Sequence, residues 1–260
     1  MPGGVAILAR RLAAVAAAAC ASLIGFGAAQ AASPFANWAA IVIAGDYHAH
    51  SGARSAAFDN ARQDVSAALL KLGFAKDHIA QFSSSPDALP ADVKPARLEV
   101  ILPEFQRLAA AAPDGCLMFL TSHGAPGLVM MSDQPMMASG LAEIIDSACP
   151  DPKPAVLIIS ACYSGSLIPT LSGPNRMIIT AARSDRSSFG CGESDKYTYF
   201  DTCVLQSLPT VDDFVALASA AKACVAQREK ETNATPPSEP QVAVGAGVAP
   251  LLPFYSFSQH

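Results

Sequence analysis

The chain carries little charge and has no excess of basic residues. Its 260 residues include 17 Lys and Arg against 22 Asp and Glu, which gives a formal net charge of −5. Proteins that bind nucleic acid neutralise phosphates with clustered basic side chains, and no basic stripe is present to do so. The composition therefore argues against a nucleic-acid-binding protein.

The sequence also lacks internal repeats and a Gly-rich phosphate loop ahead of a helix. Charged residues make up 15% of the chain and apolar residues 51%, so a sizeable core can be buried and global disorder is excluded. A length of 260 residues suits one α/β domain better than two very small ones.

The first residues have the pattern of an export signal. Arg10 and Arg11 precede an uncharged apolar run, and small residues follow up to Ala32. The run is short for a bilayer span and rich in the weakly apolar Ala, which favours a cleavable signal peptide over residues 1–32 rather than a retained anchor. We therefore expect a periplasmic or secreted protein, a single domain over residues 33–260 and no stable membrane insertion once the leader is removed.

Six cysteines remain after the leader, and an oxidising compartment would favour pairing of exposed thiols. The spacing does not fix their connectivity. Cys116 opens an apolar strand, which is typical of an inert core residue. A bridge of Cys191 with Cys203, or of either with Cys149 or Cys224, stays open. The six are Cys116, Cys149, Cys162, Cys191, Cys203 and Cys224.

Apolar runs alternate with helical patterns along the chain. Such an order predicts an α/β three-layer sandwich, with a roughly six-stranded, mostly parallel sheet and helices on both faces. A linker is expected over residues 86–95. Strands are expected at 38–44, 78–82, 116–121, 154–160, 176–181 and 241–245, a small hairpin at 128–137, and helices at 57–72, 96–112, 139–148, 199–208 and 211–231.

Polar and Gly-rich segments follow three of these strands directly. In parallel sheets, functional groups gather beyond the carboxyl ends of the strands. The rule points to the loops at residues 45–55, 122–127 and 161–166. A functional site is therefore expected where these three loops meet.

Two of the loops contain a thiol and an imidazole. Cys162 follows an apolar strand, and a helix beginning near Ser164 would direct backbone N–H groups at its sulfur and favour the thiolate. His123 ends another strand and could take the thiol proton and return it to a leaving amine. The N–H groups of Gly124 and Cys162 could stabilise an oxyanion. Asp46 and Asp59 are alternative partners that would orient the imidazole.

A single Cys near a strand end usually contributes to packing, and a single His in a loop is usually solvated. The joint occurrence changes this balance, because both residues lie at carboxyl ends of buried parallel strands and small residues follow both. The pattern indicates a Cys-His hydrolase.

The segments Ser122-His123-Gly124 and Ser160-Ala-Cys162-Tyr-Ser-Gly165, each after an apolar strand, resemble the paired signature of the legumain family of cysteine peptidases (peptidase C13). The resemblance runs from about residue 38 to residue 245. It implies a caspase-like fold, His123 and Cys162 as the catalytic dyad, a peptide or protein substrate and no cofactor. The family usually has Glu two residues before the Cys, where this chain has Ser160.

The resemblance also implies a specificity pocket. The segments at residues 180–191 and 197–201 are similar to those that line the family's pocket with a Ser and an Asp, which points to Ser187, Ser188 and Asp201. An Arg before the first helix contributes to that pocket in the family, and Arg54 or, instead, Asn60 would stand in its place. A pocket with both charges can bind a side-chain amide, which favours cleavage after Asn or Asp.

Three other functions are compatible with the sequence. A transamidase would use the same dyad and pass the acyl group to an amine. A metal-dependent hydrolase could use His48 and His50, which point the same way on an extended segment, with Asp46 or His123 as third ligand. A catalytically inactive caspase-fold binding protein would keep the fold without the reaction.

Overall fold

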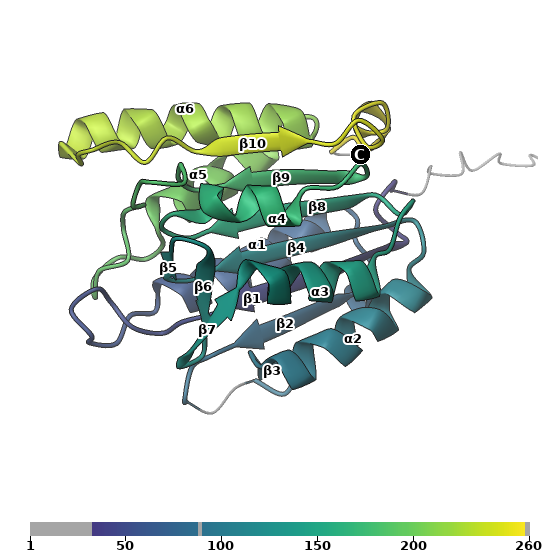
Figure 1. Ribbon diagram of the computed structural model, residues 1–260, viewed down its shortest axis with the longest axis horizontal. Coiled ribbons are helices and arrows are strands. Elements are labelled where there is room, and N and C mark those ends of the chain that lie inside the picture. The colour runs from purple at the N-terminus through teal and green to yellow at the C-terminus, as the bar shows by residue number, and fades with distance from the viewer. Residues whose placement is uncertain (1–32, 88–89, 258–260) are drawn as a thin grey trace, which may run out of the picture. The chain divides into compact units, whose positions relative to one another are not determined.

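A computed structural model of the chain describes residues 33–87 and 90–257. The expected signal peptide over residues 1–32 lies outside the described residues. The domain is built on a seven-stranded sheet in the order β10-β9-β8-β4-β1-β2-β3, and all neighbouring strands pair in parallel except β10 with β9 (Figure 1). The expected mostly parallel α/β sheet is therefore confirmed.

The central strands are continuous apolar runs because both of their faces are covered. Every residue of β1, β4, β8 and β9 is buried. The strands of the sheet are β1 (Trp38–Ala44), β2 (Ile79–Ser83), β3 (Val93–Pro95), β4 (Gly115–Thr121), β8 (Ala155–Ser160), β9 (Arg176–Thr180) and β10 (Gln241–Val244), and a small antiparallel sheet contains β5 (Gly124–Ala125), β6 (Leu128–Met131) and β7 (Gln134–Met137).

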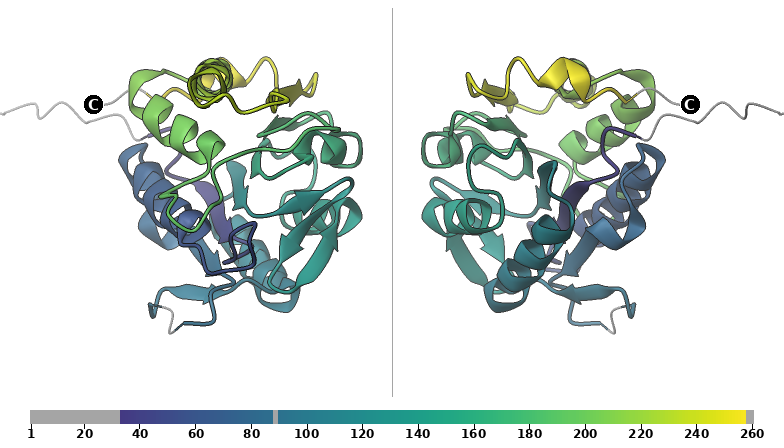
Figure 2. Two further views of the ribbon diagram at one scale, coloured as in Figure 1. Left: turned by 90° about the vertical axis from the view of Figure 1, so that its left-hand side faces the viewer. Right: turned by 90° about the vertical axis from the view of Figure 1, so that its right-hand side faces the viewer.

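Helices cover both faces of the sheet, as the two side views in Figure 2 show. Alternate residues along each strand point to opposite faces, and the buried side chains accordingly fall into two clusters. One cluster packs under α2 (Leu98–Ala111), α3 (Ala138–Ala148) and α4 (Ile168–Leu171), and the other packs under α1 (Ala57–Lys71), α5 (Tyr199–Ser207) and α6 (Phe214–Thr232).

The structure differs from the sequence-based expectations at several elements. The sheet has seven strands instead of about six, because the three-residue β3 pairs with β2 inside the segment expected to be a linker. Helix α3 begins at Ala138, one residue before its expected start, so Ser139 lies inside the helix and does not cap it. The segment after Cys162 is a 3-10 turn, Ser164–Leu167, followed by the four-residue α4.

Two disulfides join elements of the domain. Cys116, the second residue of β4, is bonded to Cys149 after α3, and Cys203 on α5 is bonded to Cys224 on α6. The expectation that Cys116 is an inert thiol is therefore wrong, since α3 brings Cys149 to a Cα–Cα distance of 6.3 Å. Cys162 and Cys191 are the free cysteines of the described part of the chain.

Across residues 33–87 and 90–257, none of the helices combines the length and the apolarity that a transmembrane span requires.

Candidate active site

The carboxyl ends of the parallel strands lie on the left of Figure 1, beside β5 and β6. Strands β4 and β8 pair so that Thr121 lies opposite Ser160, and the Ser122 N–H donates to the Ser160 carbonyl at 3.0 Å. His123 and Cys162 each come two residues after this last pair. The register therefore brings residues 123 and 162 to the ends of adjacent strands, although 39 positions separate them along the chain.

The His123 side chain lies on the face of the sheet that α1 covers. Leu117 and Phe119 of β4 pack in the cluster under α1 and α5, and His123 has the same parity along the chain. The contact with α1 agrees with this placement, because the rings of His123 and Phe58 meet edge to face with their centroids 5.2 Å apart. Val156 and Ile158 of β8 belong to the same cluster, and each precedes Cys162 by an even number of positions.

Gly124 brings the two strand ends into direct contact. A Cβ at Gly124 would lie 2.4 Å from the Cys162 carbonyl oxygen and 3.0 Å from Ala161 Cβ, so only glycine fits without displacing the nucleophile loop. The Met130 N–H donates to the His123 carbonyl at 2.9 Å. Hydrogen-bonded and open pairs alternate in an antiparallel ladder, so the following Gly124–Val129 pair is open and the Gly124 N–H points away from β6.

A backbone carbonyl orients the imidazole. His123 Nε2 lies 3.0 Å from the His48 carbonyl oxygen. Because a carbonyl oxygen can only accept, Nε2 carries the ring proton and Nδ1 is left as the acceptor in the neutral imidazole. In this tautomer Nδ1 is free to accept a proton. Neither of the carboxylates expected to orient His123 contacts it.

Asp46 holds the loop that supplies this carbonyl and has no direct contact with the His123 imidazole. Its Oδ1 accepts from the backbone N–H groups of Tyr47 at 2.7 Å and of His48 at 3.0 Å, and it lies 2.8 Å from His48 Nδ1. Asp46 is buried and holds residues 46–48 in a turn. Asp59 instead accepts from Arg62 on its own helix.

Cys162 is partly exposed, and no disulfide involves it. Its Sγ receives the Ser188 N–H at 3.3 Å and lies 3.6 Å from Ser188 Oγ. The donor to the sulfur is therefore a loop N–H, whereas the sequence predicted the N-terminus of a helix. Tyr163 turns the chain sharply after the nucleophile with a φ of 56°, and the Cys162 N–H donates to no backbone carbonyl within the described residues.

The structure brings only two of the four expected pocket residues to the nucleophile. Ser188 contacts the sulfur, and Ser187 Oγ donates to the Tyr163 hydroxyl at 3.4 Å. Arg54 lies at the surface in an ion pair with Asp87 at 2.9 Å. Asn60, the alternative to Arg54, donates to the Lys196 carbonyl.

Asp201 was expected to line the substrate pocket, but its side chain is buried in the interior. Its side chain is 0% exposed and accepts from Thr121 Oγ1 at 2.6 Å. It lies in the interior between the sheet and α5, with no exposed surface. A direct contact between Asp201 and substrate is therefore not supported.

The loop over residues 45–55 packs against the loop that follows Cys191. Ser51 Oγ donates to Glu193 at 2.7 Å, and Ser55 Oγ donates to the Gly192 carbonyl at 3.0 Å. Burial and the nearby Cys162 raise the pKa of the Cys191 thiol. The residues described contain no group of three His, Cys, Asp or Glu side chains placed to hold a metal ion, and His48 is engaged by Asp46.

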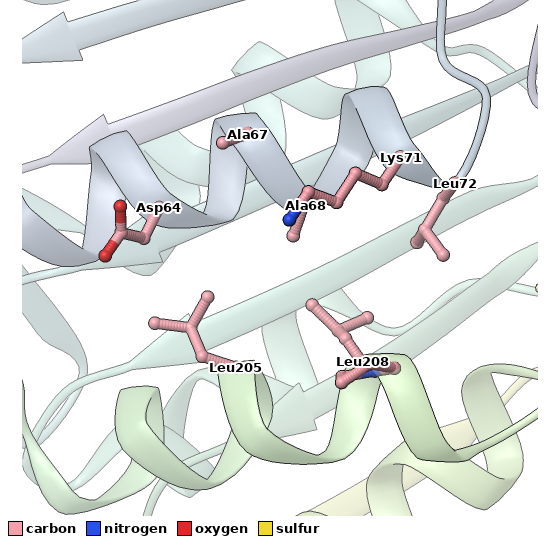
Figure 3. Close-up of a pocket in the computed structure, with 8 residues that line it drawn as sticks. Asp64, Ala67, Ala68, Lys71, Leu72, Leu205 and Leu208 are labelled. Atoms are coloured by element: carbon pink, nitrogen blue, oxygen red, sulfur yellow. The ribbon is translucent and has the colours of Figure 1, made fainter.

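A cavity of about 350 Å³ lies elsewhere, between α1 and α5 (Figure 3). Leu72 and Leu205 give it apolar walls, with Asp64 and Lys71 on the helix above. None of the residues that line it belongs to the dyad or its loops, so this cavity is separate from the candidate active site.

Comparison with known proteins identifies the family of the chain. The model of the Peptidase C13 family matches residues 100–231, a stretch that contains both His123 and Cys162 and spans about half of the chain. The chain belongs to the peptidase C13 family. No curated protein matches the chain.

Among solved structures, caspase-1 from Spodoptera frugiperda is similar at 16% identity and a TM-score of 0.59, over 81% of this chain and 87% of that chain. This likeness confirms the caspase-like fold of the C13 chain. Membership of the family, together with this fold, supports a cysteine-type peptidase.

Proposed function

We propose that the chain is a cysteine endopeptidase that hydrolyses peptide bonds through a thioester, with Cys162 as nucleophile and His123 as general base. The observation that carries this proposal is the register of β4 with β8, which sets both residues at equal height on neighbouring strand ends with Gly124 against the Cys162 carbonyl.

The geometry suits acyl transfer step by step. His123 Nδ1, which is the acceptor nitrogen when Nε2–H donates to the His48 carbonyl, takes the thiol proton. Sγ attacks the scissile carbonyl carbon, and the Cys162 and Gly124 N–H groups stabilise the negative oxygen. The C–N bond breaks, and the amine leaves with the proton from His123. Water then attacks the thioester and releases the acid and the free thiol.

The substrate residue before the scissile bond would lie near Ser187 and Ser188, which are the described hydroxyls adjacent to the nucleophile. A preference for Asn or Asp at this position stays a prediction. Arg54 would take part only if it exchanged its surface partner Asp87 for substrate.

A positional peptide library tests the proposal with three proteins: the wild type, Cys162→Ala and His123→Ala. We expect cleavage by the wild type, none by Cys162→Ala, and a loss of about 10²–10⁴-fold in His123→Ala, which lacks the general base. Added amine nucleophile separates hydrolysis from transamidation, because a transamidase would give amide products. Cleavage that survives in Cys162→Ala would contradict the mechanism.

We also propose that the protein is exported. The two disulfides among the described residues support this, because such bonds persist mainly in oxidising compartments. Fractionation of cells that express the full chain would test it, and a product confined to the cytosol at its full mass of 26.8 kDa would argue against export.

A further inference from the structure

We propose that Asp201 is a positioning residue for the dyad, which ties together the ends of the two strands that carry His123 and Cys162. This inference rests on the proposed function, since it assigns a supporting role to the same site. The argument begins with the helix that carries Asp201.

The start of α5 has the sequence of a capping box, in which Thr198 caps the helix and Asp201 occupies its third position. Thr198 Oγ1 accepts from the Asp201 N–H at 3.0 Å, as such a cap requires. In a complete box the acid would turn back to the N–H of the capping residue. Asp201 instead points into the sheet, where Oδ2 accepts from Thr121 Oγ1 at 2.6 Å.

The start of α5 contacts both catalytic strands, through the Asp201 carboxyl to β4 and the Thr198 hydroxyl to β8. Thr121 lies two residues before His123 on β4, and Ser160 lies two residues before Cys162 on β8. Ser160 Oγ lies 3.2 Å from Thr198 Oγ1, the same hydroxyl that caps the helix of Asp201. One helix start therefore holds the last paired residues of both strands through buried hydroxyls.

The environment is one that a purely structural carboxylate would avoid. Asp201 is fully buried, and its Oδ1 has no hydrogen-bond partner among the described residues. Burial raises the pKa of the Asp201 carboxyl to about 6, although the hydroxyls of Thr121, Ser160 and Thr198 act in the opposite direction. Buried polar groups that lack a partner are rare and destabilising, so their retention calls for a functional explanation.

The distance over which Asp201 acts is short. Only one residue separates Thr121 from His123, and one separates Ser160 from Cys162, so a displacement of either strand end moves the imidazole or the thiol directly. Misplacement of reacting groups by about 1 Å can reduce the rate by about 10²-fold. Asp201 is not expected to contact substrate, so its loss should lower kcat and leave KM nearly unchanged.

The test uses four variants of the full chain. Asp201→Ala removes the carboxyl, Thr121→Val removes the donor while keeping the shape, and Thr121→Ser restores a hydroxyl. Glu229→Gln is the control, because Glu229 is also a buried acid but accepts from the Ser238 N–H on the C-terminal side of α6. Circular dichroism first shows that each variant is folded at the assay temperature.

Two readouts follow, which are peptide cleavage and the rate at which iodoacetamide alkylates Cys162, resolved from Cys191 by peptide mass spectrometry. We expect kcat to fall by about 10–10²-fold in Asp201→Ala and in Thr121→Val, with KM within about twofold of the wild-type value. Iodoacetamide should alkylate Cys162 more slowly in both variants. Thr121→Ser should recover most of both losses, and Glu229→Gln should match the wild type.

Equal kcat and equal alkylation rates in the wild type, Asp201→Ala and Thr121→Val would overturn the proposal, as would a loss in Glu229→Gln of the same size. Should Asp201→Ala not fold, Thr121→Val and Thr121→Ser decide the question alone. If the wild type cleaves no peptide, the proposed function fails, whereas slower alkylation in the two variants would still support the role of Asp201.

Discussion

The two ends of the same sheet are built for different purposes. At the amino end, Trp38 packs against Phe35, Phe214 and Tyr255, and the nearby Cys116 is bonded to Cys149. At the carboxyl end the same strands finish in Ser, His and Gly, with a partly exposed thiol that no disulfide involves. The contrast indicates that stability is concentrated at one end, so that the other can hold unpaired and reactive groups.

The largest effect on catalysis is expected from a substitution of Gly124, at the carboxyl end of the sheet. Its replacement by Ala places a Cβ 2.4 Å from the Cys162 carbonyl, which displaces the nucleophile loop and one oxyanion donor. We expect kcat to fall by about 10²–10³-fold, measured on a cleaved peptide. Gly173→Ala is the control, because its Cβ would meet only the Arg176 side chain, at 3.3 Å. Equal losses in the two variants would contradict the close contact at the carboxyl end.

Removal of the Cys116–Cys149 bond should lower the stability of the fold and leave catalysis unchanged. The bond closes a loop of 33 residues, and its loss as Cys116→Ala with Cys149→Ala should lower the free energy of unfolding by about 4 kcal/mol. Because the bond lies at the amino end, kcat and KM should not change below the melting temperature. Urea unfolding and peptide kinetics on the same samples check this, and a large fall in kcat would show that the two ends are coupled.

Asp201 should make the stability depend on pH in an acid range. Its pKa is about 6 in the folded chain and about 3.9 in the unfolded chain, so the folded state alone keeps the proton between these values. The stabilisation is fully present below pH 4 and is lost as the pH rises through 6. Asp201→Asn removes this dependence, so its stability relative to the wild type should rise by about 2 kcal/mol from pH 4 to pH 7. Urea unfolding at several pH values measures it, and a difference that does not vary with pH would contradict the burial of a titrating carboxyl.

The smallest effect is expected at the contact between the two outer loops. Ser51→Ala removes the hydrogen bond to Glu193, which is exposed. We expect KM to change by no more than about twofold, with kcat and stability unaffected. A change of tenfold or more in KM would show that this contact shapes the substrate site directly.

The sequence was sufficient to predict the central sheet and to select the two residues of the proposed dyad. Strands β1, β4, β8 and β9 are buried on both faces and therefore appear as continuous apolar runs. Because active groups in such sheets follow the strands, Cys162 and His123 could be selected without knowledge of the pairing. The three-residue β3 has no such signal, since it lies among turn-forming residues.

The supporting contacts of the site could not be read from the sequence, for physical reasons. The imidazole is oriented by the carbonyl of His48, and every residue has a carbonyl. The sulfur receives the N–H of Ser188 from a loop whose path depends on tertiary packing. For Asp201 a signal did exist, because Thr198 and Asp201 have the spacing of a helix cap, yet that spacing does not show that the acid turns to Thr121.

The most direct measurement of the central claim is active-site labelling with a peptide that carries a thiol-reactive electrophile at its carboxyl end. Mass spectrometry should find one adduct per chain, on Cys162, formed much more slowly in His123→Ala and absent in Cys162→Ala. An adduct on Cys191 in place of Cys162, or labelling at the same rate without the imidazole, would contradict a dyad assembled by the register of β4 and β8.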